Sequence, residues 1–233
     1  EVYRKLRGRA LFAKKQAAID TCAAHDLGVV LVPTLVPGVN VQAIGAILEF
    51  AVSHAPVVRG VHFQPVSYFG RYPEAPADED RVTIPEVIRA IEAQTQGAIR
   101  TASFVPPGCE NALCSFHGNF VVMPDGSLQP WSQRKSCGCS CDAERADEGA
   151  EKARNFVSAY WSAPATAAPS SDGPSLGGWD LFLQRAQTHA FCISGMAFQD
   201  AWTLDLERLR DCCIHTVSSD GRLIPFCAYN LTN

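Results

Sequence analysis

Ten cysteines are the residues of this 233-residue chain that are best able to do chemistry. Four of them flank short segments of strand-and-turn character, namely Cys109, Cys114, Cys212 and Cys227. Four thiolates hold a cubane iron–sulfur cluster, and one cluster can join segments that are distant in sequence. Four thiolates also hold a structural zinc ion. The spacing leaves both metal sites open, with buried inert thiols as the third interpretation.

A second group consists of Cys137, Cys139 and Cys141, which alternate with Gly138 and Ser140. In an extended conformation the three thiols would project from one face, because strand side chains alternate with a period of two. They could ligate a second cluster or form a redox-active or surface group, and the sequence leaves both open. Cys22 is expected to be a packing residue of a helix.

Composition excludes several classes of protein. The formal net charge is −4 and 47% of the residues are hydrophobic. This mild acidity lacks the clustered Lys and Arg typical of a nucleic-acid binder. No apolar run approaches the roughly 20 residues that span a bilayer, so we expect no membrane span. A cytoplasmic protein follows as the expectation, and in that reducing compartment cysteines favour ligation or redox chemistry over disulfides.

The first half of the chain alternates helical and strand patterns. Strands are predicted over 29–36, 57–66 and 99–105, and helices over 3–26, 41–54 and 84–96. Near-continuous apolar strands between helices are typical of parallel βα units. We therefore predict an α/β fold in which residues 1–106 form the C-terminal part of a partial (βα) TIM-type barrel. A complete barrel has eight strands, so the missing ones are expected upstream of Glu1.

The second half, 107–233, is predicted to be a small cysteine-rich α+β domain with two hairpins. The hairpins span 116–131 and 214–226, each with an Asp-Gly turn, and resemble a weak internal repeat. Further expected elements are a polar helix over 142–160, a flexible linker over 162–178, a helix over 179–187, an irregular segment over 192–200 and a helical turn over 204–210.

The loop after the second predicted strand carries four candidate binding residues, Gln64, Ser67, Tyr68 and Arg71. Barrel enzymes take their functional groups from loops at the C-terminal ends of strands. These side chains are therefore expected to contact substrate or cofactor, with loop packing as the alternative.

Several runs resemble a known family. The segments YRKLRG at 3–8, LVPTLVPGVN at 31–40 and VHFQPVSYFGR at 61–71 resemble the later βα units of radical S-adenosylmethionine (radical SAM) enzymes. The tail, with FQDAW at 198–202 and IPFC at 224–227, is similar to the branch that contains archaeal tetraether lipid synthase. Within that branch it most resembles the radical SAM (seleno)proteins of the TrsS type.

The resemblance implies an enzyme that cleaves S-adenosylmethionine and abstracts hydrogen from a small-molecule or lipid-like substrate. It implies an auxiliary 4Fe-4S cluster held by Cys109, Cys114, Cys212 and Cys227, and an electron donor such as ferredoxin or flavodoxin. The family's Cys-x₃-Cys-x₂-Cys motif is not in this sequence. It is expected upstream, so this chain alone would be an inactive fragment. Gly195 stands where the tetraether branch has a cysteine. The competing hypothesis is a non-catalytic, zinc-stapled binding or assembly module.

Overall fold

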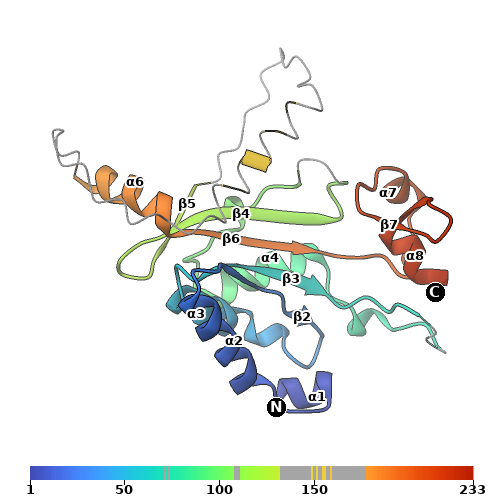
Figure 1. The fold of residues 1–233 in the computed structure, drawn as a ribbon. Helices are drawn as coiled ribbons and strands as arrows, with labels where there is room; N and C mark the ends of the chain where they lie inside the picture. The colour runs from blue at the N-terminus through green and yellow to red at the C-terminus, as the bar shows by residue number, and fades with distance from the viewer. Residues whose placement is uncertain are drawn as a thin grey trace.

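The computed structural model describes residues 1–70, 72, 74–107, 111–131 and 177–232, together with positions 148, 151, 154, 155 and 158. Within these residues, six strands form one mixed sheet in the order β1-β3-β6-β4-β5, with β2 also paired to β3 (Figure 1). The strands are β1 (Val29–Leu31), β2 (Thr34–Leu35), β3 (Val58–Pro65), β4 (Ser115–Val122), β5 (Leu128–Pro130) and β6 (Ala190–Met196). The α/β class is thereby confirmed.

Three strand pairs of the sheet are parallel and two are antiparallel. Strands β1, β2 and β6 run parallel to β3, whereas β4 runs antiparallel to both β6 and β5. A separate antiparallel hairpin joins β7 (His215–Val217) to β8 (Leu223–Pro225). The parallel pairs agree with βα units, while closure into part of a barrel stays a prediction.

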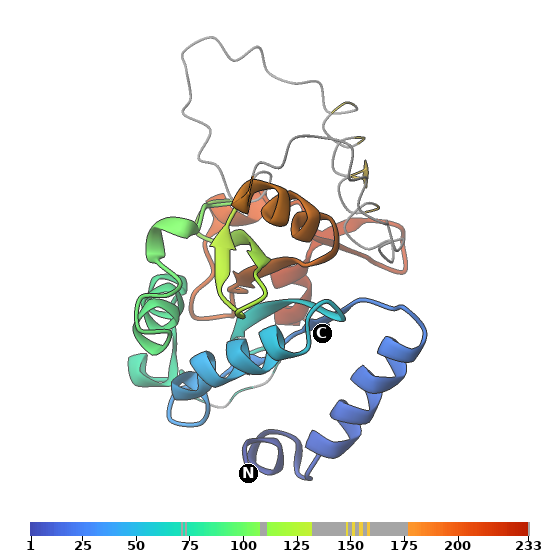
Figure 2. The ribbon, with the colours of Figure 1, turned by 90° about the vertical axis from the view of Figure 1, so that its left-hand side faces the viewer.

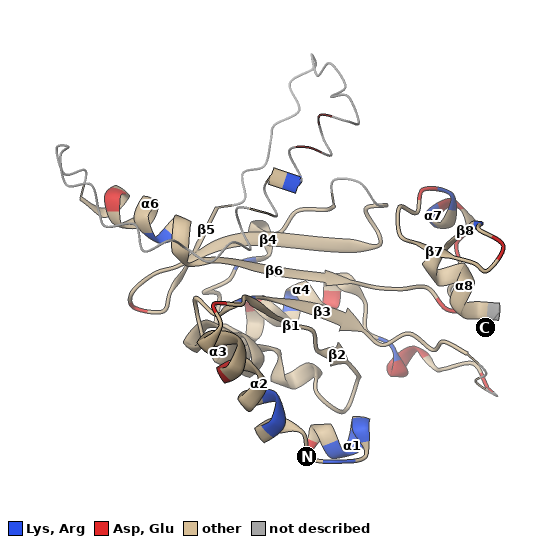
Figure 3. Cartoon of the chain, in the orientation of Figure 1, with Lys and Arg blue, Asp and Glu red and all other residues tan. Residues whose placement is uncertain are grey.

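The helices are α1 (Val2–Arg7), α2 (Phe12–Ala24), α3 (Ile44–Ser53), α4 (Ile84–Gln94), α6 (Gly178–Thr188), α7 (Leu206–Arg210) and α8 (Phe226–Thr232), with 3-10 turns η1 (Val41–Ala43), η2 (Asp78–Asp80) and η3 (Thr101–Ser103). The helix predicted over 3–26 is interrupted at Gly8, which adopts a left-handed φ of 71° and caps α1. Several Lys and Arg residues lie on α1 and α2, where the ribbon is blue in Figure 3. Among the described helices, none combines the length and apolarity needed to cross a bilayer.

The apolar core lies between one face of the sheet and the helices α3 and α4, which lie beside the sheet in Figure 2. Phe63 of β3, Phe120 of β4 and Ile193 of β6 are almost completely buried there, as are Leu48 of α3 and Ile91 of α4. Helix α4 begins with the predicted capping box, in which Glu86 accepts hydrogen bonds from the backbone N–H and hydroxyl of Thr83. This cap fixes the start of α4 against the sheet.

Strand β6 corrects the prediction of an irregular segment over 192–200. Residues Ala190–Met196 form a strand between β3 and β4. Phe191, Ile193 and Gly195 are buried, while the residues between them are half-buried. An alternation with a period of two is the sequence pattern that could have predicted this strand. One sheet thus contains strands from both sides of residue 106, and the division into domains at that point stays a prediction.

The strand predicted over 99–105 is also wrong. The segment forms η3 and makes one isolated bridge, between Val105 and His117. The backbone N–H and hydroxyl of Thr101 both donate to the Glu92 carboxylate, the N–H at 2.8 Å. The N–H is therefore committed to a side chain of α4 and is not used in a strand ladder. The predicted strand over 29–36 divides into β1 and β2 around Pro33, which has no N–H to donate.

Gly60 of β3 permits the close approach of β6. A Cβ atom at this position would lie 2.2 Å from the Cys192 carbonyl oxygen. That oxygen belongs to the backbone of the paired strand and cannot move without breaking the ladder. Gly60→Ala is therefore expected to lower the free energy of unfolding by about 1–3 kcal/mol, the usual cost of overpacking. Urea denaturation measures this change. Gly178→Ala in α6 is the control because a Cβ there meets no atom within 4 Å, and equal midpoints for the two variants would contradict the packing argument.

Candidate functional site

Three of the four predicted metal-ligating cysteines lie in one neighbourhood. Cys114 directly precedes β4, Cys212 lies between α7 and β7, and Cys227 is in the first turn of α8. Burial raises the pKa of the Cys227 thiol, a hydrogen bond from the Gln199 N–H opposes this, and the charges of Cys212 and Cys114 raise the pKa further. Such charge interactions fall off with distance, so these cysteines, about 100 residues apart in sequence, lie in one region of the fold.

Arg208 of α7 supplies a positive charge to this cysteine neighbourhood. Its Nε and Nη2 atoms lie 3.4 and 3.3 Å from the Cys114 Sγ, and Nη2 also donates to the Ala197 carbonyl at 3.2 Å. The same guanidinium partly opposes the rise in the pKa of Cys227 that burial causes. A nearby cation favours the thiolate form, which is the form that ligates metals.

The cysteine thiols and the hydrogen bonds to them have the chemistry of ligands to a metal ion or cluster. The Gln199 N–H donates to the Cys227 Sγ at 3.3 Å, and hydrogen bonds to sulfur are a feature of protein-bound iron–sulfur clusters. The Cys212 thiol donates to the Ile214 carbonyl at 3.1 Å. Among the described residues, no three His, Cys, Asp or Glu side chains are arranged to hold a metal ion. Cys109, Cys137, Cys139 and Cys141 lie outside the described residues.

The predicted binding loop lies at the C-terminal end of β3. Gln64 pairs with Thr34 of β2. The Ser67 hydroxyl donates to the Phe198 carbonyl at 2.9 Å, and the Tyr68 N–H donates to the Asp200 carboxylate at 3.1 Å. Ser67 and Tyr68 thus contact the segment that follows β6. Arg71 lies outside the described residues.

Asp200 is the central residue of this region that sequence reasoning missed. Its side chain is completely buried and receives two hydrogen bonds from the Arg81 guanidinium, at 2.9 and 3.1 Å. It also accepts from the Trp202 N–H and the Thr203 hydroxyl. Burial raises the pKa of Asp200, but Arg81 and the Tyr68 N–H lower it more, so the net pKa lies below the ordinary value.

A signal for part of this arrangement was present in the sequence. Asp followed by Trp and Thr two and three residues later favours a turn closed by the Asp side chain, and the Asp200 turn has that form. The partnership with Arg81 had no local signal, because 119 residues separate the two side chains.

Four consecutive residues after β6, 197–200, connect the cysteine neighbourhood with the β3 loop. Ala197 donates its N–H to the Cys114 carbonyl at 2.9 Å, and Gln199 donates to Cys227. The Phe198 carbonyl accepts a hydrogen bond from the Ser67 hydroxyl, and the Asp200 carboxylate accepts one from the Tyr68 N–H. We call these residues the connector. Residues 197 and 199 contact the cysteine neighbourhood, whereas residues 198 and 200 contact the β3 loop. This alternation is expected for an extended chain.

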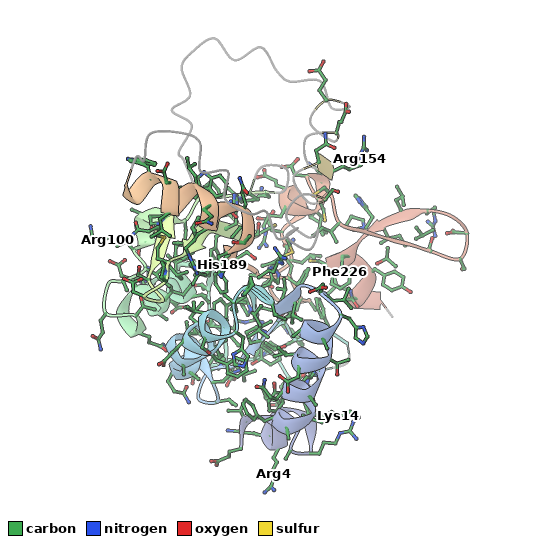
Figure 4. The ribbon with its side chains drawn as sticks, turned by 60° about the vertical axis from the view of Figure 1, so that its left-hand side comes forward. Arg4, Lys14, Arg100, Arg154, His189 and Phe226 are labelled. Carbon is green, nitrogen blue, oxygen red and sulfur yellow. The ribbon has the colours of Figure 1, made fainter. Side chains whose placement is uncertain are left out.

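An aromatic cluster supports the connector from α8. The ring centroids of Phe198 and Phe226 are 4.9 Å apart, and Phe69 lies 6.0 Å from Phe226. Phe226 marks the start of α8 in Figure 4. Figure 1 shows α7 and α8 at the end of the sheet to which β3 and β6 point. The loop and the cysteines are therefore assembled at the carboxyl ends of parallel strands, where α/β proteins bind ligands.

Comparison with known proteins gives one informative likeness, while no family model matches the chain. The chain is 31% identical, over 269 aligned positions, to 7,8-dihydro-6-hydroxymethylpterin dimethyltransferase of Methanocaldococcus jannaschii. The alignment covers 98% of this chain and 53% of that enzyme, so the chain spans about half the length of its relative. The cysteine-bearing tail and the β3 loop thus both fall within a stretch that is similar to a pterin dimethyltransferase.

Proposed function

We propose that the chain is part of a radical SAM enzyme of the methyltransferase type that acts on a small molecule. The resemblance of 3–8, 31–40 and 61–71 to radical SAM βα units supports the superfamily. The likeness to a pterin dimethyltransferase supports methyl transfer to a small molecule as the reaction class. The finer resemblance of the tail to the tetraether synthase branch and to TrsS-type proteins stays a prediction, as do hydrogen abstraction and a ferredoxin or flavodoxin donor.

The observation that carries the proposal is the shared neighbourhood of Cys114, Cys212 and Cys227 beside the Arg208 guanidinium. These thiols, with Cys109 as the fourth ligand, would hold an auxiliary 4Fe-4S cluster. When bound, such a cluster supplies electron transfer. Arg208 orients the Cys114 sulfur through its hydrogen bonds, and Gln199 orients the Cys227 sulfur.

The protein's other task in such an enzyme is to position the cofactor and substrate and to exclude water. We assign this role to Gln64, Ser67, Tyr68 and Arg71, which would face S-adenosylmethionine or the substrate in the complete protein. Asp200 holds Tyr68 and Arg81 in place from the tail. The connector would therefore hold the β3 loop in a fixed position relative to the cysteine site.

Metal analysis of the anaerobically purified chain tests the proposal. We expect iron and acid-labile sulfide in equal amounts, with a brown colour and absorbance at about 400 nm from thiolate-bound clusters. A colourless protein that contains only zinc would contradict the proposal and favour the zinc-stapled module, since the same thiols fit zinc. A protein that takes up neither metal would also contradict it.

A further inference from the structure

Helix α7 is fixed at its start beside the cysteine neighbourhood. The Asp205 side chain caps the helix by accepting hydrogen bonds from the N–H groups of Glu207 and Arg208, at 2.9 and 3.3 Å. The Asp205 N–H in turn donates to the side chain of Gln199, which is almost completely buried. In Figure 1, α7 lies with β7 and α8 at one end of the sheet. The backbone that carries Arg208 is therefore tied to the connector.

The stretch from Gln199 to Cys212 reaches all three described cysteines of the neighbourhood. The Gln199 N–H donates to the Cys227 Sγ at 3.3 Å. Arg208 donates from Nε and Nη2 to the Cys114 Sγ, at 3.4 and 3.3 Å. Cys212 itself ends the stretch, directly after α7. One continuous stretch thus provides one sulfur and hydrogen-bonds the other two.

The Arg208 guanidinium is held against sulfur and not against a carboxylate. Its Nη2 also donates to the Ala197 carbonyl at 3.2 Å, which fixes the plane of the group. Among the described residues, the ion pairs join other arginines to Asp200 and Asp220. Arg208 is half-buried, so solvent and salt screen its charge less than that of an exposed arginine. Its positive charge therefore acts mainly on the cysteine neighbourhood.

A fixed positive charge beside ligand sulfurs favours the reduced form of a cluster. Reduction adds one negative charge, and the attraction to a nearby cation grows with that charge. Net charge and hydrogen bonds to the sulfurs are two of the factors that set the potential of an iron–sulfur cluster. Arg208 supplies both factors at Cys114. Its charge also acts on Cys227, so the effect extends beyond a single sulfur.

We propose that Arg208 raises the reduction potential of an auxiliary 4Fe-4S cluster held by the cysteine neighbourhood and so makes this site an acceptor of single electrons. The inference rests on the proposed function, because it requires the cluster. The cluster core takes one electron from a one-electron reductant, its charge falls by one, and no bond is made or broken. Arg208 acts through Cys114 and is therefore a positioning residue. A purely structural role would change cluster content and leave the potential unaltered.

A redox titration of the anaerobically purified 233-residue chain, with dithionite as the reductant, tests the inference through the EPR signal of the reduced cluster. We expect Arg208→Gln to keep the iron and sulfide of the parent. At a fixed ambient potential its ratio of reduced to oxidised cluster should fall at least tenfold, which is a midpoint lower by about 59 mV for one electron.

Arg210→Gln is the matched control. Arg210 lies on the same helix and is exposed, so this variant loses the same formal charge at a screened position. Its midpoint should equal that of the parent. Arg208→Lys keeps a positive charge but loses the forked pair of hydrogen bonds. Its midpoint should lie between those of the parent and Arg208→Gln.

A midpoint of Arg208→Gln that equals or exceeds that of Arg210→Gln, at full iron and sulfide content, would overturn this inference and leave the cluster proposal standing. If Arg208→Gln binds no cluster, Arg208→Lys decides in its place. A midpoint of Arg208→Lys below that of Arg210→Gln would then support the inference, and an equal or higher one would overturn it. A parent chain that binds no iron and sulfide would refute the proposed function and this inference together.

Discussion

Replacing Cys212 and Cys227 together with alanine is expected to remove the absorbance at about 400 nm and to reduce bound iron to background. Both thiols belong to the cysteine neighbourhood, and Cys227 is buried within it. A cubane cluster needs four protein ligands, and the double variant leaves at most two of the four predicted ones. Anaerobic reconstitution followed by iron and sulfide analysis measures the loss.

Cys22→Ala is the matched control for this experiment. Cys22 lies on α2 and is not one of the predicted ligands, so its removal should leave iron content and colour unchanged. Full retention of iron by the double variant would contradict the assignment of Cys212 and Cys227. It would shift attention to Cys137, Cys139 and Cys141 as the ligands.

Asp200→Ala is expected to produce the largest loss of stability in the described part of the chain. The carboxylate is completely buried and binds Arg81, Tyr68, Trp202 and Thr203. Removing one partner of a buried ion pair costs about 3–5 kcal/mol, because the other charge is left without compensation. Urea denaturation at pH 7 measures the change in the free energy of unfolding.

Asp220→Asn is the control for Asp200→Ala. Asp220 forms an exposed ion pair with Arg222, in which both side chains are more than half exposed. Solvent and salt screen such pairs, so no measurable change is expected. If Asp200→Ala were as mild as Asp220→Asn, Asp200 would not be the link between the β3 loop and the tail.

The effect of Asp200 should also depend on pH. Its pKa in the folded protein lies below the ordinary value, despite the opposing effect of burial. A group of this kind adds stability above its unfolded pKa, about 3.9 for Asp, and the contribution is lost as pH falls through the folded value. The stability difference between the parent and Asp200→Asn should therefore be full at pH 7 and shrink below about pH 4. A difference that grows on acidification would contradict this origin.

Elements with a strong local signal were predictable from the sequence. The capping box at Thr83 and Glu86 fixed the start of α4, and the Asp-Gly turns fixed both hairpins, because these features depend on residues a few positions apart. The apolar run of β3 was equally clear. The third predicted strand failed because Glu92 competes for the N–H of Thr101, a contact across nine residues that no apolar pattern reveals.

For the site, the sequence alone determined the residue types: the cysteines able to ligate a metal, and the polar loop of Gln64, Ser67 and Tyr68 after a strand. Only the tertiary structure decided that β6 lies between β3 and β4, which brings Asp200 to Arg81 and Ser194 to His62. These pairs join residues more than 100 positions apart. Pairing over such separations is set by strand order and by the burial of Phe191 and Ile193 in a shared core, and the local pattern of either partner carries no record of it.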